Sequence, residues 1–283
     1  MKFGINSLAW LSPFGRDAYE QFKKAKDFGF DIYEIAIEDF SIVDAAEIKD
    51  AMAKTGIEVK TLCGAFGETR DVSSENPEYR KIGVQYIKDM IDFADSIGAE
   101  VVAGPLYSAV GKARKTTPEQ KAQAWAWAVE NLNECADYAK DKKIRLAIEP
   151  LNRFETDFIN IVDQGLDLMD RMGNKENVGF LLDTFHMNVE ESNIPAAIRA
   201  AKDRIFDFHT CANNRGTPGE DNFDWQAINA ALKDANYDEY CVIESFTPDC
   251  EEIAKAASLW REFAPSKEYL AENGLKFLRS VIK

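Results

Sequence analysis

The amino-acid sequence predicts an α/β protein built as a single (β/α)8 barrel, with residues 1–283 forming one domain. Eight short runs of apolar and β-branched residues recur along the chain, each followed by a longer amphipathic stretch. The runs begin 27 to 45 residues apart, which leaves room for a strand, a helix and two loops. The alternative is an open doubly wound sheet. No Gly-x-Gly-x-x-Gly motif follows the first run, so the nucleotide-binding form of that fold lacks its main signature.

The strands are expected where apolar runs of four to seven residues stand between polar or glycine-containing segments. These runs are Lys2–Asn6, Asp31–Ile37, Glu58–Leu62, Glu100–Ala103, Arg145–Glu149, Val178–Asp183, Ile205–His209 and Cys241–Glu244. Two of the gaps between them are longer than the rest, and they predict extended loops at Gly64–Tyr79 and Pro105–Thr117.

The segments between the strands carry helix patterns and helix boundary signals. Between Lys81 and Gly98, five apolar residues fall on one face at helical spacing: Tyr86, Ile87, Met90, Ala94 and Ile97. The Thr117–Gln120 stretch predicts a capped helix start with proline in the first turn, for a helix that runs through Tyr138. Asp224 can cap a helix that carries Ile228, and Ser266–Lys283 reads as a terminal helix. Glycines stand where helices should stop, at Gly29, Gly98 and Gly173.

The composition limits the classes of function. The chain has 34 Lys and Arg residues against 49 Asp and Glu residues, a net charge of −15 that disfavours binding to nucleic acid. No run approaches the ~20 apolar residues that span a bilayer, and the first residues do not form a signal peptide. The five cysteines are odd in number and form no Cys-x-x-Cys pair, which favours reduced thiols and a cytoplasmic location. They are Cys63, Cys135, Cys211, Cys241 and Cys250.

Four successive strands each end on a possible metal ligand. The ligands are Glu149, Asp183, His209 and Glu244, separated by 34, 26 and 35 residues, or one βα unit each. Because the carboxyl ends of barrel strands form one rim, we expect these side chains to meet there. Three carboxylates and one imidazole form a hard donor set that suits Mn²⁺, Mg²⁺ or Co²⁺ better than a structural zinc. The alternative is that they are separate polar residues that cap the following helices.

Polar loops follow these strand ends and add candidate substrate ligands. Glu155, His186 and Arg215 lie in these loops, so both histidines of the chain belong to the same rim. A lone histidine such as His186 is often structural. Arg153 and Glu155 could equally form a solvated ion pair worth ~0–1 kcal/mol.

Several strings in this region closely resemble the ketose 3-epimerases, the D-tagatose 3-epimerase and D-allulose (D-psicose) 3-epimerase family of sugar isomerase/epimerase TIM barrels. The strings are Glu-Pro-Leu-Asn-Arg-Phe-Glu at 149–155, Leu-Asp-Thr-Phe-His-Met-Asn at 182–188, the stretch from His209 through Asn214-Arg215 to Pro218-Gly219, and Ile243-Glu244. The resemblance runs from the first strand to Trp260-Arg261 and is strongest over residues 149–246.

The resemblance implies one divalent metal ion, Mn²⁺ by preference with Mg²⁺ or Co²⁺ as alternatives. Its ligands would be Glu149, Asp183, His209 and Glu244. Glu155, His186 and Arg215 would hold the oxygens at C1–C3 of a free ketose such as D-tagatose, D-fructose, D-allulose or a ketopentose. Glu149 and Glu244 would be the catalytic pair. One removes the C3 proton to give a cis-enediolate and the other returns a proton on the opposite face. The family also implies a homodimer or homotetramer.

The sequence departs from the family in the region that would hold the far end of the sugar. A tryptophan common after the fourth strand is missing at Ala109-Val110, and the Gly64–Arg70 loop is unusually charged. Trp10 and Tyr107 could line the pocket or belong to the core. A keto-glycoside substrate therefore stays open.

Three rival functions also stay open. The first is an aldose–ketose isomerase using the same metal site. The second is an endonuclease-IV-like phosphodiesterase, which two histidines and a charge of −15 oppose. The third is a non-catalytic sugar-binding protein.

Overall fold

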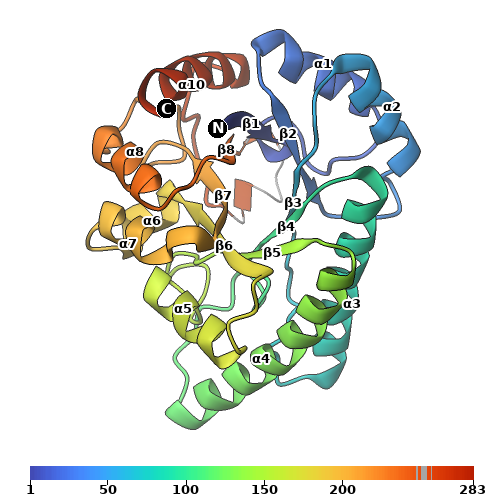
Figure 1. Ribbon diagram of the computed structural model, residues 1–283, viewed down its shortest axis with the longest axis vertical. Coiled ribbons are helices and arrows are strands. Elements are labelled where there is room, and N and C mark those ends of the chain that lie inside the picture. Colours follow the sequence, from blue (N-terminus) through green and yellow to red (C-terminus); the bar gives the residue numbers. More distant parts are fainter. Residues whose placement is uncertain (247, 250–253, 256) are drawn as a thin grey trace.

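Eight parallel strands close into one barrel in the computed structural model, which describes residues 1–283 except 247, 250–253 and 256. The strands follow each other around the barrel in chain order, and β1 closes it by pairing with β8 (Figure 1). The predicted (β/α)8 barrel is therefore confirmed. The open doubly wound alternative is wrong, because Lys2 lies opposite Tyr240 and Ile5 opposite Ile243. Cys250 lies outside the described residues.

The strand bounds agree closely with the sequence-based expectation, except at the third strand. They are β1 Lys2–Asn6, β2 Ile32–Ile37, β3 Thr61–Gly64, β4 Val101–Gly104, β5 Arg145–Ile148, β6 Val178–Asp183, β7 Ile205–Thr210 and β8 Tyr240–Ile243. Ile32 pairs with Glu58 but Ile35 pairs with Leu62, so the β3 segment has one residue more than β2 over this stretch. This extra residue interrupts the ladder as a bulge does, and the regular strand begins only at Thr61.

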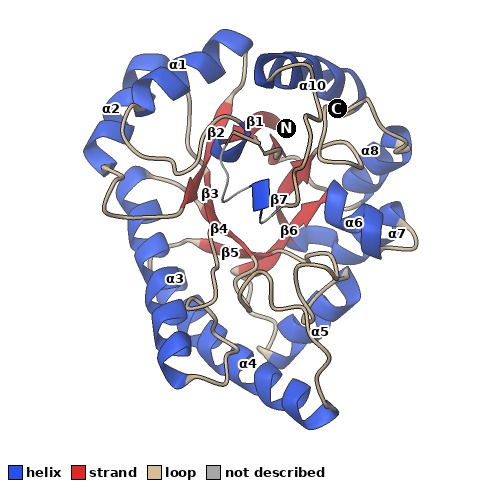
Figure 2. Ribbon diagram, turned by 180° about the vertical axis from the view of Figure 1, so that it is seen from behind, coloured by secondary structure: helices blue, strands red, loops and turns tan. Residues whose placement is uncertain are grey.

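The helices form an outer ring around the barrel (Figure 2). Their bounds are α1 Ala18–Phe28, α2 Ala45–Thr55, α3 Pro77–Ile97, α4 Pro118–Asp141, α5 Val162–Arg171, α6 Thr184–Glu190, α7 Ile194–Ala201, α8 Trp225–Asp234 and α10 Lys267–Val281. No helix among the described residues combines the length and the apolar character that a membrane crossing needs.

Most of the predicted helix boundaries are confirmed. Thr117 forms the complete capping box of α4, Asp224 caps α8 and Ser266 caps α10. Gly29 and Gly98 end α1 and α3 in the left-handed conformation, and Gly173 follows the last residue of α5 by two positions. The start of α3 was predicted too late. Asn76 caps it with its side chain and Pro77 opens the first turn, so the preceding loop is shorter than expected.

Side chains fill the barrel interior in layers of different polarity. The layer nearer the amino ends of the strands is apolar and consists of Ile32, Val101, Ala103, Ala147, Leu181, Phe206, Tyr240 and Val242. Towards the carboxyl ends the inward-pointing residues become polar: Asn6, Glu34, Thr61, Asp207 and His209, all fully buried. The apolar layer provides a packed floor, and the polar layer above it supports the rim where the candidate site lies.

Candidate active site

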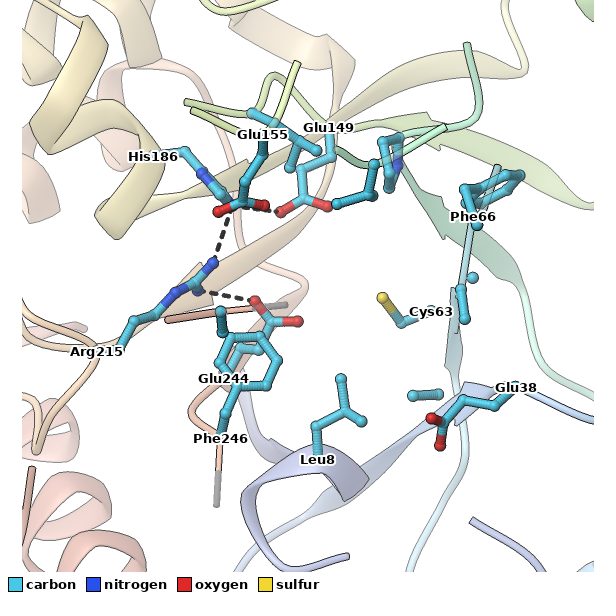
Figure 3. Close-up of a pocket in the computed structure, with 18 residues that line it drawn as sticks. Leu8, Glu38, Cys63, Phe66, Glu149, Glu155, His186, Arg215, Glu244 and Phe246 are labelled. Atoms are coloured by element: carbon cyan, nitrogen blue, oxygen red, sulfur yellow. Dashed lines mark hydrogen bonds and ion pairs between the residues drawn. The ribbon is translucent and has the colours of Figure 1, made fainter. Parts of the chain in front are cut away.

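The four predicted metal ligands meet at the carboxyl-end rim of the barrel. Asp183 is the last residue of β6, His209 lies opposite it in β7, and Glu149 and Glu244 directly follow β5 and β8. One ligand atom from each lies within 4.8 Å of the other three, and all four residues are buried. Figure 3 shows the Glu149 and Glu244 carboxylates turned towards one another on the polar side of a cavity. The group has the donor types and the spacing to hold a metal ion.

Arg215 brings positive charge into this acidic group. Its Nη1 lies 2.5 Å from an Asp183 oxygen and 2.9 Å from a Glu244 oxygen. Its Nη2 lies 2.9 Å from Nε2 of His186 (Figure 3). Burial lowers the pKa of Arg215, but the Asp183 and Glu244 carboxylates outweigh burial and raise that pKa well above its usual value. Arg215 therefore stays charged within the cavity.

The two facing glutamates have opposite proton affinities. Burial raises the pKa of Glu149 well above its ordinary value, and the neighbouring carboxylates of Glu244 and Asp183 raise it further. Burial also acts on Glu244, but His209 and Arg215 outweigh it and hold the Glu244 pKa at about 2. In the metal-free protein, Glu149 therefore holds a proton more readily than Glu244 does.

His186 and Glu155 are held together by Asn152 in the loop after β5. The Asn152 backbone N–H donates to Nδ1 of His186 at 3.0 Å, which leaves Nε2 facing Glu149 Oε1 at 3.5 Å. Asn152 Nδ2 donates to Glu155 Oε1 at 2.7 Å. Burial and the charge of Arg215 lower the pKa of His186 to about 3, so its ring is neutral at neutral pH. His186 is thus part of the cavity wall.

The suggested ion pair between Arg153 and Glu155 is wrong. Arg153 Nε lies 2.9 Å from Glu190 at the end of α6, and its side chain is 62% exposed. Glu155 instead turns into the cavity beside Glu149 and His186 (Figure 3). Burial raises the pKa of Glu155. The structure therefore places Glu155 with the other predicted substrate ligands.

The residues beneath His209 were missed by the sequence analysis. Glu34 Oε1 lies 2.8 Å from His209 Nε2 and also accepts a hydrogen bond from Asn6 Nδ2 at 2.6 Å. Asp207 lies two residues before His209 on the same face of β7, 3.9 Å from Nε2. A charged residue inside the apolar run Ile32–Ile37 was the signal that could have found Glu34. His209 Nδ1, the other ring nitrogen, lies 3.4 Å from Glu244 and faces the four-residue group.

The cavity above this group has a volume of about 310 Å³ and two unlike walls. One wall is polar and contains Glu149, Glu155, His186, Arg215 and Glu244. The opposite wall is mainly apolar, with Leu8, Ala36, Cys63, Phe66, Pro105 and Val110, while Phe246 lies beside Arg215 (Figure 3). Glu38, which follows β2, brings a carboxylate to that second side (Figure 3). A small polyol with one oxygen-rich reacting end fits such a cavity.

The remaining candidate pocket residues belong to the core or to the loop scaffold. Trp10 packs against Phe30 and Tyr33. The hydroxyl of Tyr107 donates to the Glu149 carbonyl at 2.9 Å and so anchors the backbone of that residue. Neither Trp10 nor Tyr107 is among the described residues that line the cavity.

Arg70, in the charged loop after β3, is also held away from the cavity. It donates to the carbonyl oxygens of Ala65 and Glu38, and its guanidinium lies over the ring of Tyr86. Arg215 is then the cavity's single arginine or lysine among the described lining residues.

Known proteins share this fold and length. The model of the family described as xylose isomerase-like TIM barrel matches residues 22–281. The probable ketose 3-epimerase of Synechocystis sp. is 36% identical over 280 residues, covering 99% of this chain and 96% of that protein. D-psicose 3-epimerase of Agrobacterium fabrum is 32% identical, covering 100% of this chain and 99% of its own length.

A solved structure of a 3-epimerase also has the same fold as this chain. The structure of D-psicose 3-epimerase with D-tagatose from Clostridium cellulolyticum H10 matches with a TM-score of 0.92 at 29% identity and covers 100% of both chains. The fold, the full-length matches and the converging rim residues lead to one conclusion. The chain belongs to the xylose isomerase-like TIM barrels and, within them, to the ketose 3-epimerases, which are isomerases.

Proposed function

We propose that the protein epimerises free ketoses at C3 with the help of one divalent metal ion. The substrates would be of the D-tagatose, D-fructose, D-allulose or ketopentose type. The observation that carries this proposal is the pair of facing carboxyl groups, Glu149 and Glu244, within one group of metal-ligand type. Two such carboxyl groups suit a reaction in which one takes a proton and the other gives one.

The donor set fits a hard divalent cation. Three carboxylates and an imidazole nitrogen stand within 4.8 Å of one another, and His209 Nδ1 makes no hydrogen bond to the described residues. Oxygen-rich sites of this kind favour Mn²⁺, with Mg²⁺ or Co²⁺ as alternatives. A bound cation would supply Lewis-acid polarisation of the ketone oxygen and counter-charge for the oxygens at C2 and C3.

The two glutamates then divide the proton transfer between the faces of C3. One glutamate would remove the C3 proton from one face, and the other glutamate would deliver a proton to the planar carbon from the opposite face. In this proposal the configuration inverts because the two proton transfers occur on opposite faces of C3. A single carboxylate would return the proton to its original face and leave the sugar unchanged.

The polar wall would hold C1–C3 of the sugar. The Arg215 guanidinium donates hydrogen bonds, so it can stabilise oxygen atoms on which negative charge develops, and His186 Nε2 lies 2.9 Å from it. Glu155 can accept a hydrogen bond from a substrate hydroxyl. Among the described residues that line the cavity, four are glutamates (Glu38, Glu149, Glu155 and Glu244), with Arg215 as their cationic counterpart. That balance favours a neutral sugar over a phosphorylated one.

We also infer a homodimer or homotetramer in the cytoplasm. Phe154 and Trp260 are 76% and 74% exposed, which favours a subunit contact at these surfaces. Cys63, Cys135, Cys211 and Cys241 are free and buried, in keeping with a reducing compartment.

Deuterium exchange tests the proposed function. The Mn²⁺-loaded protein is incubated in D₂O with D-fructose, D-tagatose, D-allulose and D-ribulose, and the products are separated and analysed by NMR. We expect deuterium at C3 together with the C3 epimer. Label confined to C1 or C2 would indicate an aldose–ketose isomerase. Absence of exchange with every sugar would favour a binding protein.

Removal of the metal is expected to abolish activity and to lower stability. Without a cation, the carboxylates at the rim repel one another with Arg215 as the main counter-charge. Mn²⁺ at about 100 times its Kd should stabilise the fold by about 2.7 kcal/mol. Thermal melts and turnover after EDTA treatment, with Mn²⁺ added back, check both effects. Full activity in metal-free protein would contradict the proposed metal role.

A further inference from the structure

Among the described residues, the side of the cavity opposite Arg215 carries one charged group, Glu38. Of the lining residues contributed by the described chain before Glu149, the others are apolar residues, glycines and Cys63. Glu38 directly follows β2, whose inward-facing residues Glu34 and Ala36 line the barrel mouth below it. In Figure 3 its carboxylate points back towards the cavity and Leu8, across from Arg215 and His186.

This carboxylate is fixed rather than freely mobile. The Ser12 hydroxyl donates to Glu38 Oε1 at 2.6 Å. The Arg70 guanidinium donates to the Glu38 carbonyl oxygen at 2.9 Å and so holds its backbone. Glu38 is half-buried. A carboxylate has about four lone-pair sites, so with its position defined it can accept a further hydrogen bond from a ligand hydroxyl.

The direction of the bound sugar follows from the proposed function. If Glu155, His186 and Arg215 hold C1–C3, the chain beyond C3 must extend away from them, along the wall formed by Leu8, Phe66 and neighbouring apolar residues. An apolar wall offers no acceptor for the terminal hydroxyl of a ketohexose. Glu38 is the charged acceptor on that side.

We propose that Glu38 is a specificity-determining residue that accepts a hydrogen bond from the hydroxyl at the C6 end of a ketohexose. This inference rests on the proposed C3 epimerisation and goes beyond it by naming the substrate feature that is selected. It makes ketohexoses with a free terminal hydroxyl preferred over 6-deoxy-ketohexoses. Sugars that carry a phosphate or carboxylate at that end are rejected by like charge.

Kinetics with three matched substrates test the assignment. D-Tagatose has the terminal hydroxyl, 6-deoxy-D-tagatose lacks only that group, and D-ribulose is too short to reach the same position. A hydrogen bond to a charged group corresponds to roughly a 10- to 100-fold effect on kcat/KM. In the Mn²⁺-loaded wild type we expect D-tagatose to exceed its 6-deoxy analogue by that factor.

The variant Glu38→Ala should remove this preference. We expect its kcat/KM for D-tagatose to fall roughly 10- to 100-fold, mainly through KM, and to change little for the other two sugars. Glu38→Gln keeps an acceptor oxygen and should restore part of the preference. Asp39→Asn is the matched control, because the neighbouring Asp39 is exposed and accepts from the Ser41 backbone instead.

The possible failures are distinguishable. Equal losses for all three sugars in Glu38→Ala would show a structural role, and unchanged kinetics would show no contact; either result overturns the assignment while leaving C3 epimerisation intact. Absence of C3 exchange by the wild type with every ketose would instead overturn the proposed function, and this inference with it.

Discussion

Replacement of Glu149 or Glu244 by glutamine is expected to lower the rate of C3 epimerisation by about 10²–10⁴-fold, because each variant loses one of two proton-transfer groups. Glutamine has nearly the same shape as glutamate, so the barrel should remain folded. The remaining carboxylate can still remove a proton from its own face and return one there. Each variant should therefore exchange deuterium into one C3 epimer without inverting it.

The two variants are expected to exchange deuterium into different C3 epimers, so the experiment tests each glutamate separately. If Glu149 and Glu244 serve opposite faces, the epimer that exchanges in Glu149→Gln is the one that does not exchange in Glu244→Gln. Asp183→Asn is the matched control, because it changes a third member of the same group without removing either facing carboxyl. It should slow both epimers equally. Manganese content is measured in all variants by elemental analysis. Unchanged turnover in either glutamine variant would remove the catalytic assignment.

The sequence predicted the rim of the barrel well because each candidate ligand is tied to a strand end. In a closed barrel, a residue that ends a strand has a fixed place on the rim, so Asp183 and His209 had to become neighbours once β6 and β7 paired. The same reasoning needed no knowledge of long-range packing. It placed Glu149 and Glu244 correctly although each lies one residue beyond its strand.

Partners that depend on tertiary packing could not be predicted in the same way. Arg153 pairs with Glu190, 37 positions away, rather than with its near neighbour Glu155. The third strand starts late because its pairing with β2 contains an extra residue, which no local pattern reveals. Glu34 was missed because a charged residue inside an apolar strand is stable only with a buried partner. That partner, His209, belongs to β7 and is far from Glu34 along the chain.

Glu34 is also the residue whose removal should most affect the stability of the site. It is fully buried, lies 2.8 Å from His209 Nε2 and accepts a hydrogen bond from Asn6. Burial alone would raise its pKa, but the charge of His209 outweighs burial and holds the Glu34 pKa at about 2. Burial and the charge on Glu34 have the reverse effect on Asp207, whose pKa lies well above its ordinary value. Of this pair, Glu34 is therefore the acid that favours the ionised form, and Asp207 the one whose charge is disfavoured.

Substitution of these two acids should therefore have unequal effects. In Glu34→Ala, His209 and Asn6 lose a buried partner, so we expect a loss of about 3–5 kcal/mol in the free energy of unfolding. Because Glu34 contacts Nε2 and so fixes the ring that presents Nδ1 to the rim, Mn²⁺ affinity should fall about 10- to 100-fold. Asp207→Asn should be much milder, because burial and Glu34 already disfavour the charge on Asp207, and an amide is uncharged.

Urea denaturation of the metal-free proteins and calorimetric titration with Mn²⁺ measure the two effects separately. Glu58→Ala serves as the surface control, because Glu58 is 43% exposed and its ion pair with Lys2 should contribute at most about 1 kcal/mol. If Glu34→Ala matched this control in both stability and Mn²⁺ affinity, the ring of His209 would be held by the barrel packing alone. A larger loss in Asp207→Asn than in Glu34→Ala would instead place the essential negative charge on Asp207. The unequal result expected here would locate that charge on β2, directly beneath the imidazole that faces the rim.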